Sequence, residues 1–267
     1  MHPTLIDAGW FQIRSYGFAL AASFLVGIVV ATWRGKRYGV PPQIILDLSV
    51  FIILAAVVGS RLLFVLFHLD EYTSPLQFFA LWEGGATFFG GLILAIAVSY
   101  LFVRYKKLPF LLVADVISPS IALGVAVTRV GCFLSGCCYG KPTESAVGVL
   151  FPQHCPAGQS AAEVGRALGT GPVHLHPTQL YSSAAGLAIF AILMLLGPRL
   201  QKRGATFGAF LVLYSIARFT VDFFRIYEAN TRVLLGLTVS QVLSVGLFAV
   251  GLYLLVRKTP AASRISR

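Results

Sequence analysis

Long apolar segments alternate with short polar connections along this chain. They lie at about residues 16–33, 44–67, 85–103, 109–127, 179–196, 205–224 and 239–256. A helix of roughly 20 apolar residues crosses a bilayer because it satisfies its own backbone hydrogen bonds in hydrocarbon. The pattern predicts an all-α integral membrane protein with about seven transmembrane helices. No linker or repeat divides the sequence, so we expect a single transmembrane domain over residues 1–267.

The distribution of charge predicts the orientation of these helices. The chain is 57% hydrophobic and 12% charged, with a net charge of +11. Lysine and arginine gather after the first, third and fifth predicted helices and at the C-terminus. Basic residues accumulate in cytoplasmic loops. We therefore expect the N-terminus outside, the C-terminus in the cytoplasm and a long outer-face loop at about 128–178. Such short clusters do not indicate a nucleic-acid partner.

The sixth predicted helix carries a stripe of polar residues. Tyr214, Arg218, Asp222 and Arg225 follow one another at spacings of four, four and three, which place them on one helix face. Charged residues inside a membrane are costly, so this stripe should face the protein interior and is a candidate functional site. The alternative is a structural ion pair between Arg218 and Asp222.

A further arginine ends the fourth predicted helix. Arg129 lies in the segment TRVGCFLSGCCYG, in which glycines such as Gly140 permit close approach of a ligand to the backbone. Together with Arg218 and Arg225 it is expected near the outer leaflet. Because guanidinium groups bind phosphate through paired hydrogen bonds, an anionic lipid headgroup is the expected ligand.

Other polar residues extend this candidate site. His176 opens HPTQLYSS, where Gln179 and Tyr181 add hydrogen-bonding groups; it is either a proton acceptor or a helix cap. Asp115, near the start of the fourth helix, has either a structural or a catalytic role. Arg61 lies inside the second predicted span.

The four cysteines all fall in the predicted outer-face region. Cys132, Cys137 and Cys138 are close in sequence and Cys155 follows later. A structural disulfide, inert thiols and redox or metal chemistry all remain open. The spacing is not the paired C-x-x-C of a zinc site, so we expect no metal.

Seven segments in chain order resemble the bacterial prolipoprotein diacylglyceryl transferase family. They are IRSYG, VVGSRLLFVLF, EGGATFFGGL, AD before the core of the fourth helix, TRVGCFLSGCCYGKPT, HPTQLYSS and YSIARFTVDFFR. The resemblance implies a seven-helix enzyme of the bacterial plasma (inner) membrane with its active site toward the outer face. It would move diacylglyceryl from phosphatidylglycerol to the lipobox cysteine of a secreted prolipoprotein, forming a thioether and releasing glycerol phosphate, with no cofactor.

The resemblance also implies roles for individual residues. By motif position, Arg129 would bind phosphatidylglycerol, and Arg218 and Arg225 match the two arginines of the sixth helix. Other matching positions are Tyr16, Asp115, Gly140, His176, Gln179 and Tyr181.

The chain departs from the family pattern at several positions. Phe89 stands where the family has a histidine proposed as the catalytic base. Cys132, Ser135 and Cys137 replace Asn, Asn and Glu, and Ser182 replaces a Glu. We therefore expect His176, or secondly Asp115, to serve if a base is needed.

Two other functions compete with the transferase. A membrane thiol–disulfide oxidoreductase would use the outer-face cysteines. A transporter would use the intramembrane charges, but the chain shows no evident inverted repeat.

Overall fold

The fold is described from a computed structural model, which places residues 1–9, 12–68, 87–200, 202–227, 232–234 and 236–257. These residues form two compact units. Among the described residues, the first unit comprises those in 1–31 and 114–257, and the second those in 32–113. Each unit is considered by itself below.

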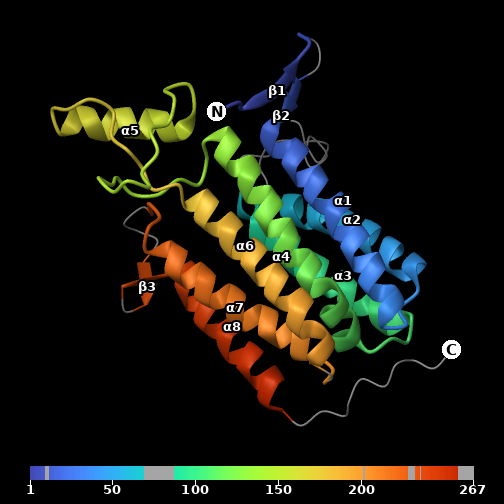
Figure 1. Cartoon of the computed structure of the whole chain (residues 1–267). Helices are drawn as coiled ribbons and strands as arrows, with labels where there is room; N and C mark the ends of the chain where they lie inside the picture. The colour runs from blue at the N-terminus through green and yellow to red at the C-terminus, as the bar shows by residue number, and fades with distance from the viewer. Residues whose placement is uncertain (10–11, 69–86, 201, 228–231, 235, 258–267) are drawn as a thin grey trace. The chain divides into compact units, whose positions relative to one another are not determined.

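The first unit is a bundle of long apolar helices (Figure 1). It contains the start of α1 (Ser15–Arg37), most of α4 (Phe110–Ser135), and α6 (Thr178–Leu196), α7 (Ala205–Asp222) and α8 (Val239–Val256). A short 3-10 turn, η4 (Gly197–Arg199), follows α6. The hydroxyl of Ser183 on α6 donates to the Ala126 carbonyl of α4 at 2.9 Å. Small residues and such interhelical bonds allow close packing in a membrane.

Helices α7 and α8 approach each other through a pair of glycines. A Cβ added to Gly251 would lie 2.8 Å from the Gly208 carbonyl oxygen, and one added to Gly208 would lie 2.9 Å from that of Gly251. Helix α8 begins at a capping box, in which Thr238 and Gln241 satisfy each other's backbone N–H groups. The contact and the cap fix where α8 starts and how closely it packs on α7.

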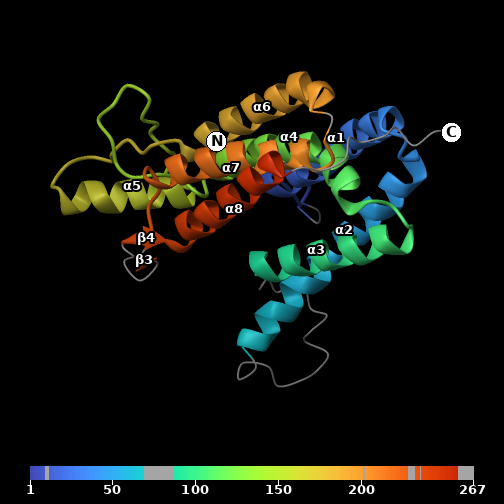
Figure 2. The same cartoon turned by 90° about the horizontal axis from the view of Figure 1, so that it is seen from below.

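The second unit contains the helical hairpin α2 (Pro42–Phe67) and α3 (Phe88–Tyr105), seen in Figure 2. The two backbones meet at Gly59 and Gly90, where a Cβ on Gly90 would lie 2.2 Å from the Gly59 carbonyl oxygen. Gly90 follows Phe89, whose side chain is 45% exposed. The glycine of this motif therefore serves helix packing.

The helices confirm the predicted apolar segments. Within the described residues, six helices are long and apolar enough to cross a membrane: α1, α2, α4, α6 extended by η4, α7 and α8. Helix α3 matches the remaining segment but is shorter, and its predicted start at residue 85 lies outside the described ranges. The chain is thus a mainly helical, multi-pass membrane protein.

One boundary was wrong. Helix α4 continues to Ser135, eight residues beyond the predicted end at residue 127, so the loop that follows it begins only at Gly136. The added turns carry Arg129 and Cys132 on the helix. Polar and glycine-rich sequence there resembled a loop, but tertiary packing keeps it helical: a Cβ on Gly131 would lie 2.4 Å from that of Ala19 on α1.

Short elements escaped prediction. They are the antiparallel hairpins β1 (Thr4–Asp7) with β2 (Gln12–Arg14) and β3 (Arg232–Leu234) with β4 (Leu237–Thr238), and helix α5 (Pro156–Ala167). Helix α5 buries Ala157 and Ala161 in a small core with Phe151, Cys155 and Leu175. A short amphipathic helix inside a loop is hard to predict because it lacks a long apolar segment.

Candidate functional site

A cavity between α4, α6 and α7 brings two of the predicted arginines together. Arg129 from α4 and Arg218 from α7 line it with Tyr214 and Ser182. The remaining lining is alanine, glycine, valine and isoleucine, and the cavity has a volume of about 20 Å³. Two guanidinium groups in an apolar cavity suit a ligand with an anionic group and a hydrocarbon part.

The polar stripe of α7 forms a network around Asp222. Arg218 Nη1 lies 3.0 Å from Asp222 Oδ1, and Arg218 Nη2 donates to the Tyr227 hydroxyl at 3.0 Å. That hydroxyl donates to Asp222 Oδ1 at 2.7 Å, and Thr238 Oγ1 donates to Asp222 Oδ2 at 3.0 Å. Asp222 is therefore fully engaged, and it orients Arg218.

The arginines retain unused hydrogen-bonding capacity. In the part of the chain that the structure describes, Arg218 Nη1 and Arg225 Nε are buried and have no aligned acceptor, although Nη1 is close enough to Asp222 for an ion pair. Buried donors of this kind are costly unless a ligand satisfies them. An anion with several oxygens, such as a phosphate diester, would do so.

Gly140 joins the loop after α4 to the segments beside α6 and α7. Its N–H donates to the His176 carbonyl at 2.9 Å, and it forms a β-bridge with Arg225. A Cβ at this position would lie 2.5 Å from the Phe224 carbonyl oxygen. Only glycine fits this junction, which places Arg225 beside the loop that follows Arg129.

The start of α6 fixes the cysteine loop. Gln179, which is fully buried, donates from Nε2 to the Cys137 carbonyl at 2.6 Å, and Thr178 Oγ1 donates to the Cys138 carbonyl at 2.7 Å. These bonds join residues some 40 positions apart. Gln179 thus shapes the loop, and its Oε1 is buried without a donor among the described residues.

His176 sits in an aromatic cluster. Its Nδ1 lies 3.0 Å from the Tyr181 hydroxyl, and its ring packs edge-on to Phe224 at 5.1 Å between centroids. Tyr181 packs against the same phenylalanine. The cluster orients the imidazole next to the Gly140 junction.

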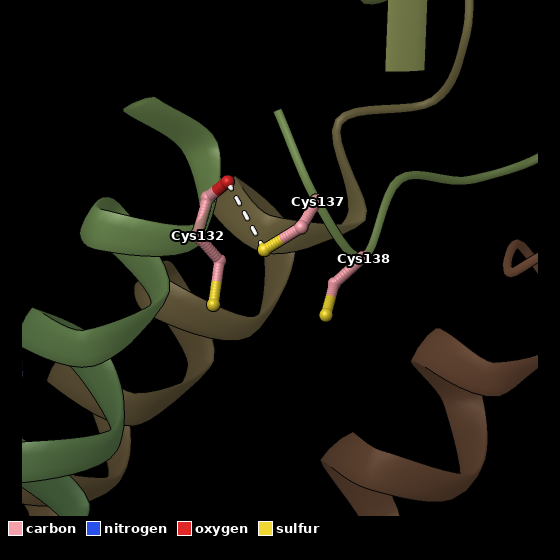
Figure 3. A group of neighbouring side chains, drawn as sticks. All are labelled: Cys132, Cys137 and Cys138. Carbon is pink, nitrogen blue, oxygen red and sulfur yellow. Dashed lines mark hydrogen bonds between the residues drawn. The ribbon is translucent and has the colours of Figure 1, made fainter. Parts of the chain in front are cut away.

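The three cysteines of the loop converge (Figure 3). The sulfur atoms of Cys132, Cys137 and Cys138 all lie within 4.8 Å of one another. Cys137 Sγ donates to the Cys132 carbonyl at 3.6 Å. All four cysteines of the chain are free thiols, so the disulfide that the sequence allowed is not formed. Cys155 is buried separately beside α5.

Charged neighbours act on this thiol cluster. The guanidinium group of Arg129 lies beside the Cys138 side chain. Bonds with the thiols of Cys132 and Cys137, reinforced by Arg225 and Arg129, lower the pKa of Cys138. Bonding to Cys132 and Cys138 raises the pKa of Cys137 instead. The cluster therefore favours one thiolate held by neighbouring thiols and guanidinium groups.

The remaining predicted residues have different locations. Tyr16, on α1, interacts with the cysteines and with Arg129 and so borders the site. Asp115 is buried and accepts the backbone N–H groups of Gly204 at 2.6 Å and Phe207 at 2.8 Å, which caps α7. Arg61 and Phe89 belong to the second unit, on α2 and α3.

Sequence reasoning missed Tyr227 and Thr238. Both hold Asp222, yet they follow α7 in a connection without regular spacing. The sequence around Thr238 could have predicted a helix start, since Thr-x-x-Gln before an apolar run is typical of one. The sequence around Tyr227 carries no comparable pattern.

Comparisons with known proteins agree with this picture. Residues 3–257 match the family model for prolipoprotein diacylglyceryl transferase. A phosphatidylglycerol–prolipoprotein diacylglyceryl transferase of Xanthomonas euvesicatoria pv. vesicatoria is 34% identical over 97% of this chain and 92% of its own length. The Geobacter sulfurreducens counterpart is 32% identical over 95% and 94%, and that of Trichormus variabilis 31% over 99% and 93%. The chain belongs to the prolipoprotein diacylglyceryl transferase family.

Proposed function

We propose that this chain transfers the diacylglyceryl group of phosphatidylglycerol to the lipobox cysteine of secreted prolipoproteins, the first step of lipoprotein maturation. The observation that carries the proposal is the cavity in which Arg129 and Arg218 meet in apolar surroundings. Its relatives are named for this reaction, and the chain covers more than nine-tenths of their length. The comparisons give no support to a thiol–disulfide oxidoreductase.

The arginines would hold the phosphate of the lipid. Arg129 and Arg218 would clamp the phosphate oxygens, with Arg225 in support, so that charge developing on the leaving glycerol phosphate meets donors already in place. The buried Nε of Arg225, which has no acceptor among the described residues, supports this role. Tyr214 would extend the same binding surface inside the cavity.

The nucleophile would be the acceptor's own thiol. Its sulfur would attack the glycerol carbon that carries the phosphate, forming a C–S bond as the C–O bond breaks. His176 is the proposed proton acceptor, because its imidazole is oriented by Tyr181 next to Gly140 and Arg225. Replacing His176 by alanine should then slow turnover at least about 100-fold, the lower end for a general base. Unchanged turnover would exclude this role.

Other residues would support binding. Gly140 and Gln179 shape the loop beside the arginines, Tyr181 orients His176, and Tyr16 borders the cluster from α1. Asp222 would orient Arg218, while Asp115 and Arg61 would serve folding.

The expected membrane arrangement is part of the proposal. Seven spans in one transmembrane domain, an outer N-terminus and a cytoplasmic C-terminus would put the site at the outer face of the inner membrane. Basic residues in the connections that follow α1, α3 and α6 support this orientation. A secreted prolipoprotein would meet phosphatidylglycerol at that face.

Incubation with both substrates tests the activity. The purified full-length chain is mixed with phosphatidylglycerol and a lipobox peptide, and peptide mass and glycerol phosphate are followed. We expect a diacylglyceryl adduct and one glycerol phosphate per adduct with the cysteine peptide, and neither product with a serine peptide. Absence of both products from the cysteine peptide would refute the proposal.

A further inference from the structure

The structure assigns a metal site that the family resemblance does not imply: we propose that Cys132, Cys137 and Cys138 bind one thiophilic ion, zinc in particular, whose fourth position takes the acceptor's thiol. This replaces the expectation of no metal, which depended on sequence spacing. Ligand spacing in a chain need not match that of a zinc motif if the fold brings the sulfurs together. In this chain the fold brings the three sulfurs together.

The sulfur positions suit a three-thiolate site. Tetrahedral zinc with Zn–S bonds of 2.3 Å holds sulfurs about 3.8 Å apart. The three Sγ atoms lie within 4.8 Å of one another, and Figure 3 shows those of Cys132 and Cys138 directed to the same side of the loop. Adjustments of about 1 Å, within the reach of side-chain rotation, would complete the coordination.

The backbone is held in an unusual conformation at this place. Cys138 has φ of 59°, in the left-handed region, and Gly136 has φ of 66°. A non-glycine residue there is strained and persists only where its surroundings hold it. Gln179 and Thr178 hold it through the Cys137 and Cys138 carbonyls. This backbone conformation keeps the Cys138 sulfur beside those of Cys132 and Cys137.

The charges around the cluster suit a bound ion. Three thiolates and one Zn²⁺ carry a net charge of −1, and Arg129 and Arg225 lie next to Cys138. Arg129, which lies beside the Cys138 side chain, would be placed to donate an N–H···S bond to this metal ligand. On loading, the thiols of the cluster that are still protonated would release their protons to solvent.

An open fourth position would give the site a chemical role. Three protein ligands and one exchangeable position are typical of catalytic zinc, and a thiol that coordinates zinc is deprotonated. The lipobox thiol would bind there and lose its proton to His176, the proposed acceptor. Its sulfur would then attack the glycerol carbon, with the C–O bond electrons leaving on glycerol phosphate held by the arginines. The thioether, no longer anionic, would leave the metal.

This role rests on the proposed transfer, but metal binding itself can be measured separately. The reduced, chelator-treated full chain is titrated with Zn²⁺ against a chromophoric chelator, and with Cd²⁺ to record thiolate-to-metal absorption. We expect one ion per chain and an affinity at least about tenfold weaker in C132S, C137S and C138S. Cys155→Ser is the matched control and should bind as the parent does.

A second readout needs no variant and so does not depend on their folding. Zn²⁺ should slow alkylation of the partly exposed Cys137 and Cys138 at least about tenfold, because metal-bound thiolates are withdrawn from reaction. Equal alkylation rates with and without Zn²⁺, or equal affinity in C155S and the cluster variants, would overturn the metal site.

Binding of the acceptor's thiol to the metal is tested with Co²⁺ in place of zinc. A cysteine lipobox peptide should change the visible absorption of the bound ion, and a serine peptide should not. Identical spectra, or transfer at an equal rate in metal-free and zinc-loaded protein, would overturn thiol activation while leaving the transferase intact. A peptide-dependent spectrum without transfer in any metal state would instead support the metal site and refute the proposed function.

Discussion

Tyr227 lies outside the lining of the cavity but contacts Arg218, one of the two arginines that line it. Its hydroxyl accepts from Arg218 and donates to Asp222, so it fixes the arginine relative to its counterion. We expect Tyr227→Phe to slow transfer about tenfold, equivalent to about 1.4 kcal/mol in the barrier. Tyr253→Phe, at an exposed tyrosine of α8, is the matched control and should leave the rate unchanged. Equal transfer rates in Tyr227→Phe and Tyr253→Phe would show that Tyr227 does not position Arg218.

The same network gives a pH prediction. Burial first, and then the hydrogen bond to Asp222, raises the pKa of Tyr227 above its ordinary value near 10. A raised folded-state pKa stabilises the protonated form, so this contribution is complete below the unfolded value and is lost only as pH rises through the folded one. The ratio of parent to Tyr227→Phe transfer rates should therefore stay constant between about pH 6 and 9. A ratio that decreases between these pH values would contradict this prediction.

Arg218 and Asp222 on α7 could be predicted from spacing, because intramembrane charges are costly and cannot face lipid. The prediction that Arg225 continues the same helix was wrong, because α7 ends at Asp222. The cysteine cluster could not be predicted from spacing. Its sulfurs meet because a left-handed turn at Gly136 and Cys138 is tied to α6 by residues about 40 positions further along. No local pattern carries that information.

At the scale of elements, Asp115 is a helix cap. It accepts two backbone N–H groups at the start of α7. Replacing it by alanine should lower the free energy of unfolding by about 1–3 kcal/mol, because buried donors lose their acceptor. Transfer at a temperature where the variant is folded should remain near the parent rate. Asp47→Ala, which loses only a side-chain bond from Gln43, is the control for thermal unfolding in detergent. Lost transfer in a fully folded Asp115 variant would make Asp115 catalytic.

The contact of α7 with α8 supports a second prediction at this scale. Leucine at Gly251 would overlap the Gly208 carbonyl and destabilise the protein by about 1–3 kcal/mol or more. Leucine at Gly246 on the same helix meets open space and should not destabilise it. Thermal unfolding of the two variants compares them directly. Equal unfolding temperatures would show that the glycine pair does not set the packing.

The long helices could be predicted because each is an uninterrupted apolar run, and hydrocarbon leaves few alternatives to a helix. Their ends were less predictable. Helix α4 continues past Thr128 through polar and glycine residues because α1 packs against it at Gly131. Helix α5 depends on a small core formed with distant residues such as Leu175, which the loop sequence does not display.

At the scale of the whole molecule, the orientation in the membrane is a testable prediction. The charge distribution predicts that the loop after α4 lies outside. A protease site inserted at Gly169, an exposed position with open space around it, should be cut when protease is added to spheroplasts. A site added at the C-terminus should be cut only after the membrane is broken. The reverse pattern would contradict the proposed location of the site.

The claim that connects these scales is that Arg129 and Arg218 hold the lipid phosphate during transfer. The most direct measurement is the initial rate of adduct and glycerol phosphate formation in folded Arg129→Ala and Arg218→Ala, beside Arg166→Ala, which removes an exposed arginine of α5. We predict a loss of at least about 100-fold in both cavity variants, because the leaving group loses its preorganised donors, and parent activity in the third. Near-parent rates in Arg129→Ala would contradict the phosphate clamp.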